Sequence, residues 1–382
     1  MTNRRLRIVI GGDTVPTKSN EIFLKNGQED SIFNGVKNIF SSADIAIVNL
    51  ECPLTTHDKP IKKSGPCLKA DPDSINGLLN IGINVFSLAN NHIMDYGPQG
   101  LEETLSLIAD KKALFVGAGK NLESARKVLN IQKNGYQIAL ISAAEHEFSI
   151  AQEDYPGANP FEPFDTLNDI RKSKLEADLT IVLYHGGIEH YRYPSPSLQK
   201  LCRKMVENGA DVVICQHSHC IGAHENYEGG HIIYGQGNLL FDYSNNPMWQ
   251  EEMVVKIFLE DKNLSVEFIP IVKKDFAIDV ADDDDKENII TSFKERSNNL
   301  SNNDFIKNEW LSFCESRKYH YLYTFLGFGY LLRKLDRALN YMVSNALLKS
   351  ERFLVFYNFI VCEAHLDVQK VILEQTYQKN WK

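Results

Sequence analysis

Short runs of consecutive apolar residues alternate with helical segments along most of the chain, and this alternation constrains the fold more than any other feature. Such runs are typical of strands that are buried on both faces. They lie at residues 6–10, 45–48, 83–88, 114–116, 179–184, 212–215 and 232–234. Several intervening segments carry apolar residues at helical spacing, as in residues 32–40 and 198–206. Strands that alternate with helices predict a layered α/β domain.

Two other segments predict antiparallel hairpins. Asn134-Gly135 lies within the strand-like residues 128–143, and Asn-Gly is the typical turn of a two-residue hairpin. The alternating runs 253–259 and 264–271 are expected to pair across residues 261–263. The α/β pattern thus extends almost to residue 275.

The character of the sequence changes at Asp282–Asp285. Four adjacent carboxylates repel one another and typically mark a solvated linker. Beyond them the pattern is helical to the end of the chain. We therefore predict an α/β domain at residues 1–275 and a helical C-terminal region at residues 276–382. The aromatic helices of this region are expected to pack on themselves or on the main domain, and docking of a partner protein is the alternative.

Charge and cysteine content narrow the function classes and the location. Lys and Arg total 41 against 50 Asp and Glu, so the net charge of −9 argues against nucleic-acid binding. An acidic protein that acts on an anionic substrate needs local positive charge, which a metal ion would supply. The seven cysteines form no Cys-x-x-Cys pair, which predicts reduced thiols in a cytoplasmic protein. No apolar run reaches the roughly 18–20 residues of a membrane span, so we expect none.

Polar side chains follow five of the predicted strands at the point where each strand ends. In layered α/β domains, ligands collect beyond the carboxyl ends of the strands, where the loops converge. Each residue alone has an ordinary explanation, such as a helix cap, a turn or an ion pair. Together they bring carboxylate, amide and imidazole groups to one edge, which suits a divalent metal. The residues are Asp13, Glu51, Asn91 with His92, His185, and His217 with His219.

The last of these strand ends reads His217-Ser218-His219. If the strand geometry persists, the two imidazoles project to the same side, because alternate residues of a strand share a face. A bend just past the strand would instead aim both into one cleft. Either arrangement suits a metal, and a pair of hydrogen-bonded loop histidines is the alternative.

The order of these motifs resembles the calcineurin-like metallophosphoesterase superfamily, whose blocks run acidic, acidic, Asn-His, His and His-x-His. The resemblance is closer to the CapA-type branch, which is named for poly-γ-glutamate capsule synthesis, and it covers roughly residues 6–272. The matching motifs are Gly12-Asp13; Asn49-Leu50-Glu51-Cys52-Pro53-Leu54; Ala89-Asn90-Asn91-His92 with Asp95 and Gly97; His185-Gly186 with Glu189; Gly209-Ala210-Asp211 with His217 and His219; and Tyr234-Gly235 with Gly237-Asn238 and Phe241.

The resemblance implies a fold and a set of metal ligands. The fold is a four-layer α/β/β/α sandwich, in which two sheets pack face to face with helices outside, followed here by the C-terminal helical extension. Glu51 would bridge two metal positions. The remaining ligands would be Asn91, His185 and His217 at one position, and Asp13 and His219 at the other.

The resemblance also implies catalytic roles for His92 and Asp95. His92 would not bind metal but would donate a proton to the leaving group, or stabilise charge in the transition state. Asp95 would brace the Asn91-His92 loop.

One departure concerns the first motif, which is Asp-x-His in the superfamily but Asp13-Thr14-Val15 here. One metal position therefore lacks an imidazole. Either this position binds its metal weakly, or water or a neighbouring group substitutes, or the site holds a single ion. We expect one or two divalent ions, and the mixed ligands suit Mn²⁺, Zn²⁺ or Fe²⁺ without discriminating among them.

These observations predict a metal-dependent hydrolase of the phosphoesterase type, associated with capsule or exopolymer synthesis. A hydroxide on the metal would attack a phosphoester, since bound metal can lower the pKa of water to about 7. The substrate is expected to be an anionic small molecule or polymer. The alternative is a non-phosphatase component of capsule assembly that binds, joins or cleaves an amide-linked glutamyl polymer.

For other polar residues near these motifs the sequence gives weaker evidence of a role in the site. Glu189 is either a partner that orients an imidazole or a surface carboxylate. Lys62 and Lys63 could line the cleft, although exposed lysines are usually idle. Asn238 is expected to hold a turn, and Cys220 to be a buried thiol rather than a ligand.

Overall fold

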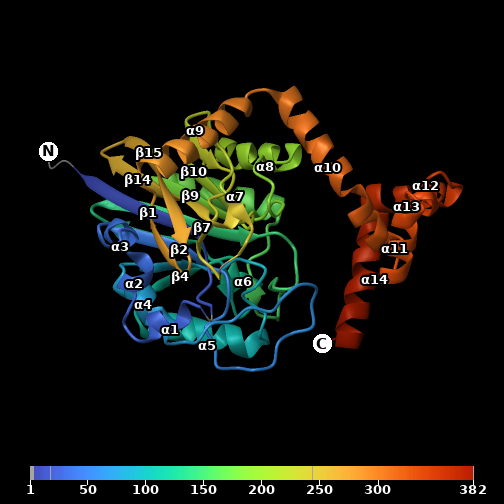
Figure 1. Cartoon of the computed structure of the whole chain (residues 1–382). Coiled ribbons are helices and arrows are strands. Elements are labelled where there is room, and N and C mark those ends of the chain that lie inside the picture. Colours follow the sequence, from blue (N-terminus) through green and yellow to red (C-terminus); the bar gives the residue numbers. More distant parts are fainter. Residues whose placement is uncertain (1–3, 18, 243, 382) are drawn as a thin grey trace. The chain divides into compact units, whose positions relative to one another are not determined.

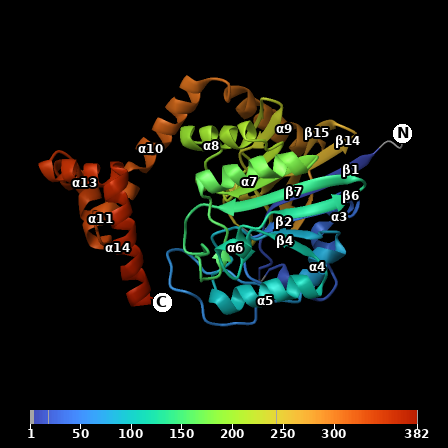
Figure 2. The same cartoon turned by 180° about the vertical axis from the view of Figure 1, so that it is seen from behind.

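The structure is a computed structural model that describes residues 4–17, 19–242 and 244–381 (Figures 1 and 2). Its first sheet has eight strands in the order β16-β15-β14-β1-β2-β3-β4, with β13 paired to β1. Strands β1 to β4 are parallel to one another, and β14, β15 and β16 follow on the other side of β1, each antiparallel to the strand before it. The strands are β1 (Arg5–Thr14), β2 (Ile45–Leu50), β3 (Val85–Ser87), β4 (Leu114–Val116), β13 (Asn238–Leu240), β14 (Glu251–Glu260), β15 (Asn263–Lys274) and β16 (Ala277–Val280).

The second sheet has six strands in the order β11-β12-β10-β9-β7-β6. Strands β12, β10, β9 and β7 are parallel, and the two edge strands are antiparallel to their neighbours. The predicted Asn134-Gly135 hairpin joins β6 to β7, and both turn residues have the positive φ that this turn requires. The strands are β6 (Leu129–Lys133), β7 (Tyr136–Ala144), β9 (Leu179–His185), β10 (Val212–Gln216), β11 (His224–Tyr227) and β12 (Gly230–Ile233); β5 (Ala118–Gly119) and β8 (Gly157–Ala158) form a separate pair.

Alternate residues of the central strands build the core between the two sheets. Ile8 and Ile47 from the first sheet pack in one cluster with Leu140, Ile181 and Ile214 from the second. Each of these strands is apolar on its other face too, because that face is covered by helices. Burying one such Ile or Leu side chain contributes about 1.5–3 kcal/mol.

Helices cover the outer face of each sheet (Figures 1 and 2). The four-layer α/β/β/α sandwich that the sequence predicted is therefore confirmed. The helices on the first sheet are α1 (Glu21–Lys25), α2 (Asp30–Phe33), α3 (Val36–Ser41), α4 (Ser74–Asn80) and α5 (Gly97–Asp110). Helices α7 (Pro163–Glu176) and α8 (Pro196–Glu207) cover the second sheet, and α9 (Asp283–Asn299) packs against β15 of the first sheet and β11 of the second; α6 (Leu122–Ala125) and a 3-10 turn (Pro247–Trp249) are short.

The acidic run Asp282–Asp285 is not a linker, which corrects the prediction. Asp282 caps α9 by accepting a hydrogen bond from the Asp285 amide at 3.0 Å, and the other three carboxylates lie in the first turn. Negative side chains stabilise this end of a helix, because its unpaired N–H groups and dipole are positive there. The helix that follows buries Ile289 and Phe293 in an apolar cluster with Met253 and Val272.

The predicted boundary near residue 276 stays a prediction, but the packing of α9 bears on it. By its contacts the chain divides into two compact units, residues 1–306 and 307–382. Residues 276–306 belong to the first unit because α9 is bound to it. The Arg296 guanidinium, for example, donates from Nε to the Gly222 carbonyl at 2.8 Å.

The second unit consists of helices, two of which are joined by hydrogen bonds to a buried carboxylate. The buried carboxylate of Asp336 accepts hydrogen bonds from the amides of Val343 and Ser344 at 3.0 and 3.2 Å. Many apolar side chains of this unit are exposed. Among the described residues, no helix is both long and apolar enough to cross a membrane. The helices are α10 (Asn303–Phe325), which begins in the first unit, α11 (Tyr330–Ala338), α12 (Met342–Leu348), α13 (Glu351–Val361) and α14 (Glu363–Trp381).

Candidate metal centre

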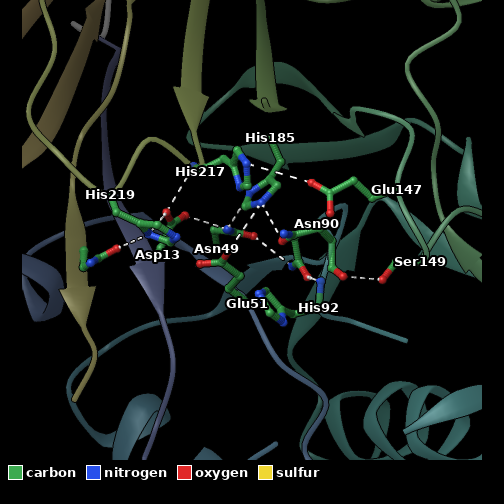
Figure 3. A network of polar contacts seen from close by, with 12 residues as sticks. Asp13, Asn49, Glu51, Asn90, His92, Glu147, Ser149, His185, His217 and His219 are labelled. Atoms are coloured by element: carbon green, nitrogen blue, oxygen red, sulfur yellow. Dashed lines mark hydrogen bonds and ion pairs between the residues drawn. The ribbon is translucent and has the colours of Figure 1, made fainter. Parts of the chain in front are cut away.

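The carboxyl ends of five parallel strands meet at one edge of the sandwich, and the predicted ligands point toward one another there (Figure 3). The contributing strands are β1 and β2, the loop after β3, and β9 and β10. Six side chains that are distant in sequence are thereby brought together. They are Asp13, Glu51, Asn91, His185, His217 and His219, and all six are buried.

Strand β1 delivers Asp13, but it does so differently from the prediction. The predicted run ends at residue 10, whereas β1 continues to Thr14 with a register irregularity before Asp13. A Cβ on Gly12 would lie 2.1 Å from the Gly237 carbonyl oxygen, so only glycine permits this approach of the two backbones. The Gly12 amide donates to the buried carboxylate of Glu252 at 2.6 Å.

A bend after β10 places both histidines of the last motif in the site. His217 has φ +88° and His219 has φ +51°, so neither residue continues the strand. Left-handed backbone is unfavourable for residues other than glycine and persists where the surrounding structure demands it. The two rings lie 5.9 Å apart between centroids. Of the two arrangements that the sequence left open, the structure therefore shows the bend.

The site has two halves, and the one with more potential ligands we call position A. It consists of Glu51, Asn91, His185 and His217. One ligand atom from each of Glu51, His185 and His217 lies within 4.8 Å of the others. The Asn91 amide oxygen lies 3.1 Å from His185 Nε2, and that nitrogen lies 3.3 Å from Glu51 Oε1.

Position B is the group Asp13, Glu51 and His219, whose ligand atoms also lie within 4.8 Å of one another. His219 Nδ1 lies 3.3 Å from Asp13 Oδ2 and 2.7 Å from the Asn238 amide oxygen. Val15, which stands where the superfamily has its histidine, is fully buried in the apolar core. Position B therefore has one imidazole.

The two positions differ in their electrostatics. Burial lowers the pKa of His185 to about 4 and that of His217 to about 3, so both imidazoles are neutral. At position B, burial opposes charge, but the ion pair outweighs it. Contact with His219 brings the pKa of Asp13 to about 2, and the charges of Glu51 and Asp13 raise that of His219 to about 10.

The surroundings of Glu51 show whether these residues fit a metal ion. Its side chain is completely buried, and neither carboxylate oxygen has a hydrogen-bond partner in the described part of the chain. Burial and the charge of Asp13 raise its pKa to about 8. A buried carboxylate without donors is costly, and a cation removes that cost. His217 Nδ1 is buried without a partner as well. The residues therefore fit a divalent cation, although their chemistry does not select Mn²⁺, Zn²⁺ or Fe²⁺.

Asn49 connects the two positions, a role that the sequence reading did not assign. Its Nδ2 group donates to Asp13 Oδ1 at 2.7 Å and lies 3.1 Å from His185 Nδ1, so one amide serves both. Its oxygen accepts from the Asn90 amide at 3.1 Å. The available signal was a polar residue near the end of an otherwise apolar strand, two positions before Glu51.

His92 lies beside positions A and B, and Asp95 holds its ring through a hydrogen bond. Its Nδ1 lies 2.6 Å from Asp95 Oδ2, which also accepts from the Leu68 amide at 2.6 Å. Lys63, whose side chain is 3 % exposed, lies 2.5 Å from the other oxygen of Asp95 and donates to the Asn91 carbonyl at 3.3 Å. Since Asp95 accepts from Nδ1, the second ring nitrogen of His92 is left for chemistry.

Asn238 was expected to hold a turn, but it begins strand β13 and accepts a hydrogen bond from His219 Nδ1. Cys220 is buried, and burial raises the pKa of its thiol to about 11. Among the described residues, Cys220 belongs to no group of His, Cys, Asp and Glu that could hold a metal. Lys63 could have lined the cleft or been an exposed lysine, and its side chain is enclosed because the long loop after Glu51 folds back over Asp95.

Comparisons with known proteins agree with this geometry. The family model described as bacterial capsule synthesis protein PGA_cap matches residues 7–243. The PGA biosynthesis protein CapA of Bacillus subtilis is 34 % identical over 218 residues, or 56 % of this chain and 57 % of its own length. The capsule biosynthesis protein CapA of Bacillus anthracis is 28 % identical over 249 residues, or 63 % and 61 %. The chain thus spans about three-fifths of the length of these relatives.

A solved structure of 5'-nucleotidase from Candida albicans aligns with 82 % of this chain and 58 % of its own, at 13 % identity and a TM-score of 0.40. We take no functional argument from a likeness of this size. The family match is different in kind, because it covers more than half of the chain and includes every strand end of positions A and B. The chain therefore belongs to the family of the bacterial capsule synthesis protein PGA_cap.

Proposed function

We propose that this protein is a metal-dependent hydrolase that cleaves a phosphoester in the synthesis of a capsule or exopolymer. The observation that carries the proposal is Glu51, whose two buried oxygens accept no hydrogen bond in the described part of the chain and lie among the carboxylate and imidazoles of positions A and B. A divalent cation held there would lower the pKa of water and offset charge on a phosphate.

The residues around Glu51 perform the rest of the chemistry. His185 and His217 are neutral and therefore offer lone pairs as ligands without first losing a proton. Asp95 fixes the ring of His92 and keeps a proton on its Nδ1, while the second ring nitrogen exchanges a proton with the leaving group. Lys63 neutralises Asp95, so this pair does not add a net negative charge beneath an anionic substrate.

The association with capsule synthesis rests on the relatives, whose names describe PGA and capsule biosynthesis. An anionic substrate, small or polymeric, suits the site because bound cations would supply the local positive charge that an acidic protein otherwise lacks. A cytoplasmic location stays a prediction from the cysteines, and the C-terminal helices stay a candidate surface for a partner.

A second function is favoured by the composition of position B. With one imidazole, it is a poorer site for the second ion of a phosphoesterase. A single cation could instead polarise a carbonyl. The protein would then bind, join or cleave an amide-linked glutamyl polymer.

Metal analysis combined with two substrate classes separates these functions. The full chain would be loaded with Mn²⁺ or Zn²⁺ and assayed on an aryl phosphate and a bis-aryl phosphodiester, with His92→Asn as the inactive control. Turnover that disappears with chelation and in His92→Asn supports the first function. A protein that binds metal, is silent on both esters and binds or cleaves poly-γ-glutamate supports the second. A protein that binds no metal contradicts both.

A further inference from the structure

The loop that follows β9 lies alongside the two histidines of the last motif. The Gly186 amide donates to the Gln216 carbonyl at 3.1 Å, and the His190 amide donates to the Ser218 carbonyl at 2.8 Å. These two hydrogen bonds tie both ends of the loop to the segment that bends after β10. Glu189, one residue before the second bond, is thereby placed next to His217 and His219.

Glu189 forms a third group of potential ligands with these histidines. One carboxylate oxygen of Glu189 and one nitrogen of each imidazole lie within 4.8 Å of one another. Both histidines are buried, and Nδ1 of His217 has no hydrogen-bond partner in the described chain. Glu189 itself is exposed, so the group opens toward solvent on one side.

Position B also lacks a ligand. Asp13 and Glu51 supply carboxylates and His219 supplies the one imidazole, while Val15 is enclosed in the core and supplies nothing. Glu189 approaches His219 from the solvent side of the site, whereas Asp13 and Glu51 are completely enclosed. We propose that Glu189 is a ligand of the divalent cation bound by His219, and that it substitutes for the imidazole missing from Asp13-Thr14-Val15.

This inference rests on the proposed metal-dependent function, and it makes position B different from position A. Every side chain of position A comes from the rigid end of a strand or the buried loop after β3. Position B would take one ligand from an exposed loop, so its ion would exchange with solvent more readily.

Glu147 supplies a matched control. Its carboxylate lies 3.9 Å from His217 Nε2, and its side chain is 39 % exposed. It therefore places a similar negative charge near the same histidine. However, among the described residues Glu147 belongs to no group of three potential ligands. Neutralising Glu147 removes charge without removing a ligand.

The test is calorimetric titration of the metal-stripped full chain with Mn²⁺, for the wild type, Glu189→Gln and Glu147→Gln. We expect a tighter and a weaker binding event in the wild type. Glu189→Gln should weaken the second event by about 10- to 100-fold or more, since even supporting residues of metal sites cost that much. Glu147→Gln should change it less than about threefold, because surface charge acts weakly. Thermal unfolding without metal verifies that both variants fold.

The outcomes distinguish the inference from the proposed function. If the wild type binds metal but the two variants weaken binding equally, or not at all, Glu189 is not a ligand and the proposed function stands. If the wild type shows a single event that Glu189→Gln leaves unchanged, the inference also fails. If the wild type binds no metal, the proposed function fails together with the inference.

Discussion

Positions A and B share Glu51 and use the same kinds of donor, yet their surroundings make them chemically different. At position A, burial keeps two imidazoles neutral, with pKa values of about 4 and 3 for His185 and His217. At position B, His219 is protonated with a pKa of about 10 and is paired with Asp13. A cation at position A meets ready lone pairs, whereas one at position B must displace a proton and break an ion pair. Position A should therefore bind more tightly.

Replacement of Glu51 should produce the largest effect, because it is the only residue in both positions. Glu51→Gln keeps the shape of the side chain but removes the charge. We expect metal affinity at both positions to fall by more than about 100-fold, beyond the loss caused by residues that only support ligands. Metal content after dialysis at defined free Mn²⁺ measures this. Retention of one tightly bound ion would show that Glu51 does not bridge.

Separate replacement of the two histidines should break the symmetry of the site. His217→Ala should abolish metal binding at position A, because His217 is one of its imidazole ligands. His219→Ala should chiefly lower occupancy of the weaker ion, by about 10- to 100-fold in affinity. Both residues have positive φ, so the backbone cost of alanine is similar in the two variants. Equal losses would contradict the ranking of A above B.

A change outside both positions should leave metal binding intact. Asp95→Asn removes the negative charge that orients His92 but touches neither ligand group. We expect turnover of a phosphoester to fall by about 10- to 100-fold, as for other residues that orient a functional imidazole. The Mn²⁺ affinity should match the wild type. If metal is lost along with activity, His92 and Asp95 support the ligands instead of the leaving group.

The pH dependence of metal affinity should also differ between the two positions. Protons compete for Glu51, whose pKa is about 8, so affinity at position A should rise by up to about tenfold per pH unit below pH 8. Affinity at position B should rise more steeply there, because His219 must lose its proton as well. Above pH 8 position A should become flat. Position B should continue to gain, because His219 still carries a proton until its pKa of about 10. Calorimetry from pH 7 to 9 in two buffers reports the protons released, and parallel curves would contradict the assignment.

The regular elements were predictable because hydrophobic periodicity is a local property of the chain. The runs at residues 6–10, 45–48 and 212–215 became β1, β2 and β10, and each carried its polar residue to the same edge. The charged run Asp282–Asp285 was misread because repulsion between neighbours was weighed without the helix that follows. Capping and the helix dipole stabilise these carboxylates at the start of α9.

The roles of three residues of the site could not be assigned from the sequence, because they depend on contacts between distant segments. Lys63 is 32 residues from Asp95 in sequence, and the fold of an irregular loop alone brings them together. Asn49 acquires its role from Asp13 and His185, which belong to different sheets. Glu189 faces the histidines because backbone hydrogen bonds tie its loop to the bend after β10.

By itself the sequence determined which segments are strands and which polar residues follow them, while the resemblance to the superfamily implied that one position lacks an imidazole. It did so because burial on two faces demands continuous apolar runs, and parallel strands share a common edge. The tertiary structure decided what those residues became. Burial lowered the pKa of His185 at position A, whereas at position B the charges of Glu51 and Asp13 outweighed burial and raised the pKa of His219. In the described part of the chain the buried oxygens of Glu51 accept no hydrogen bond. Those properties depend on what surrounds a side chain, which sequence neighbours do not specify.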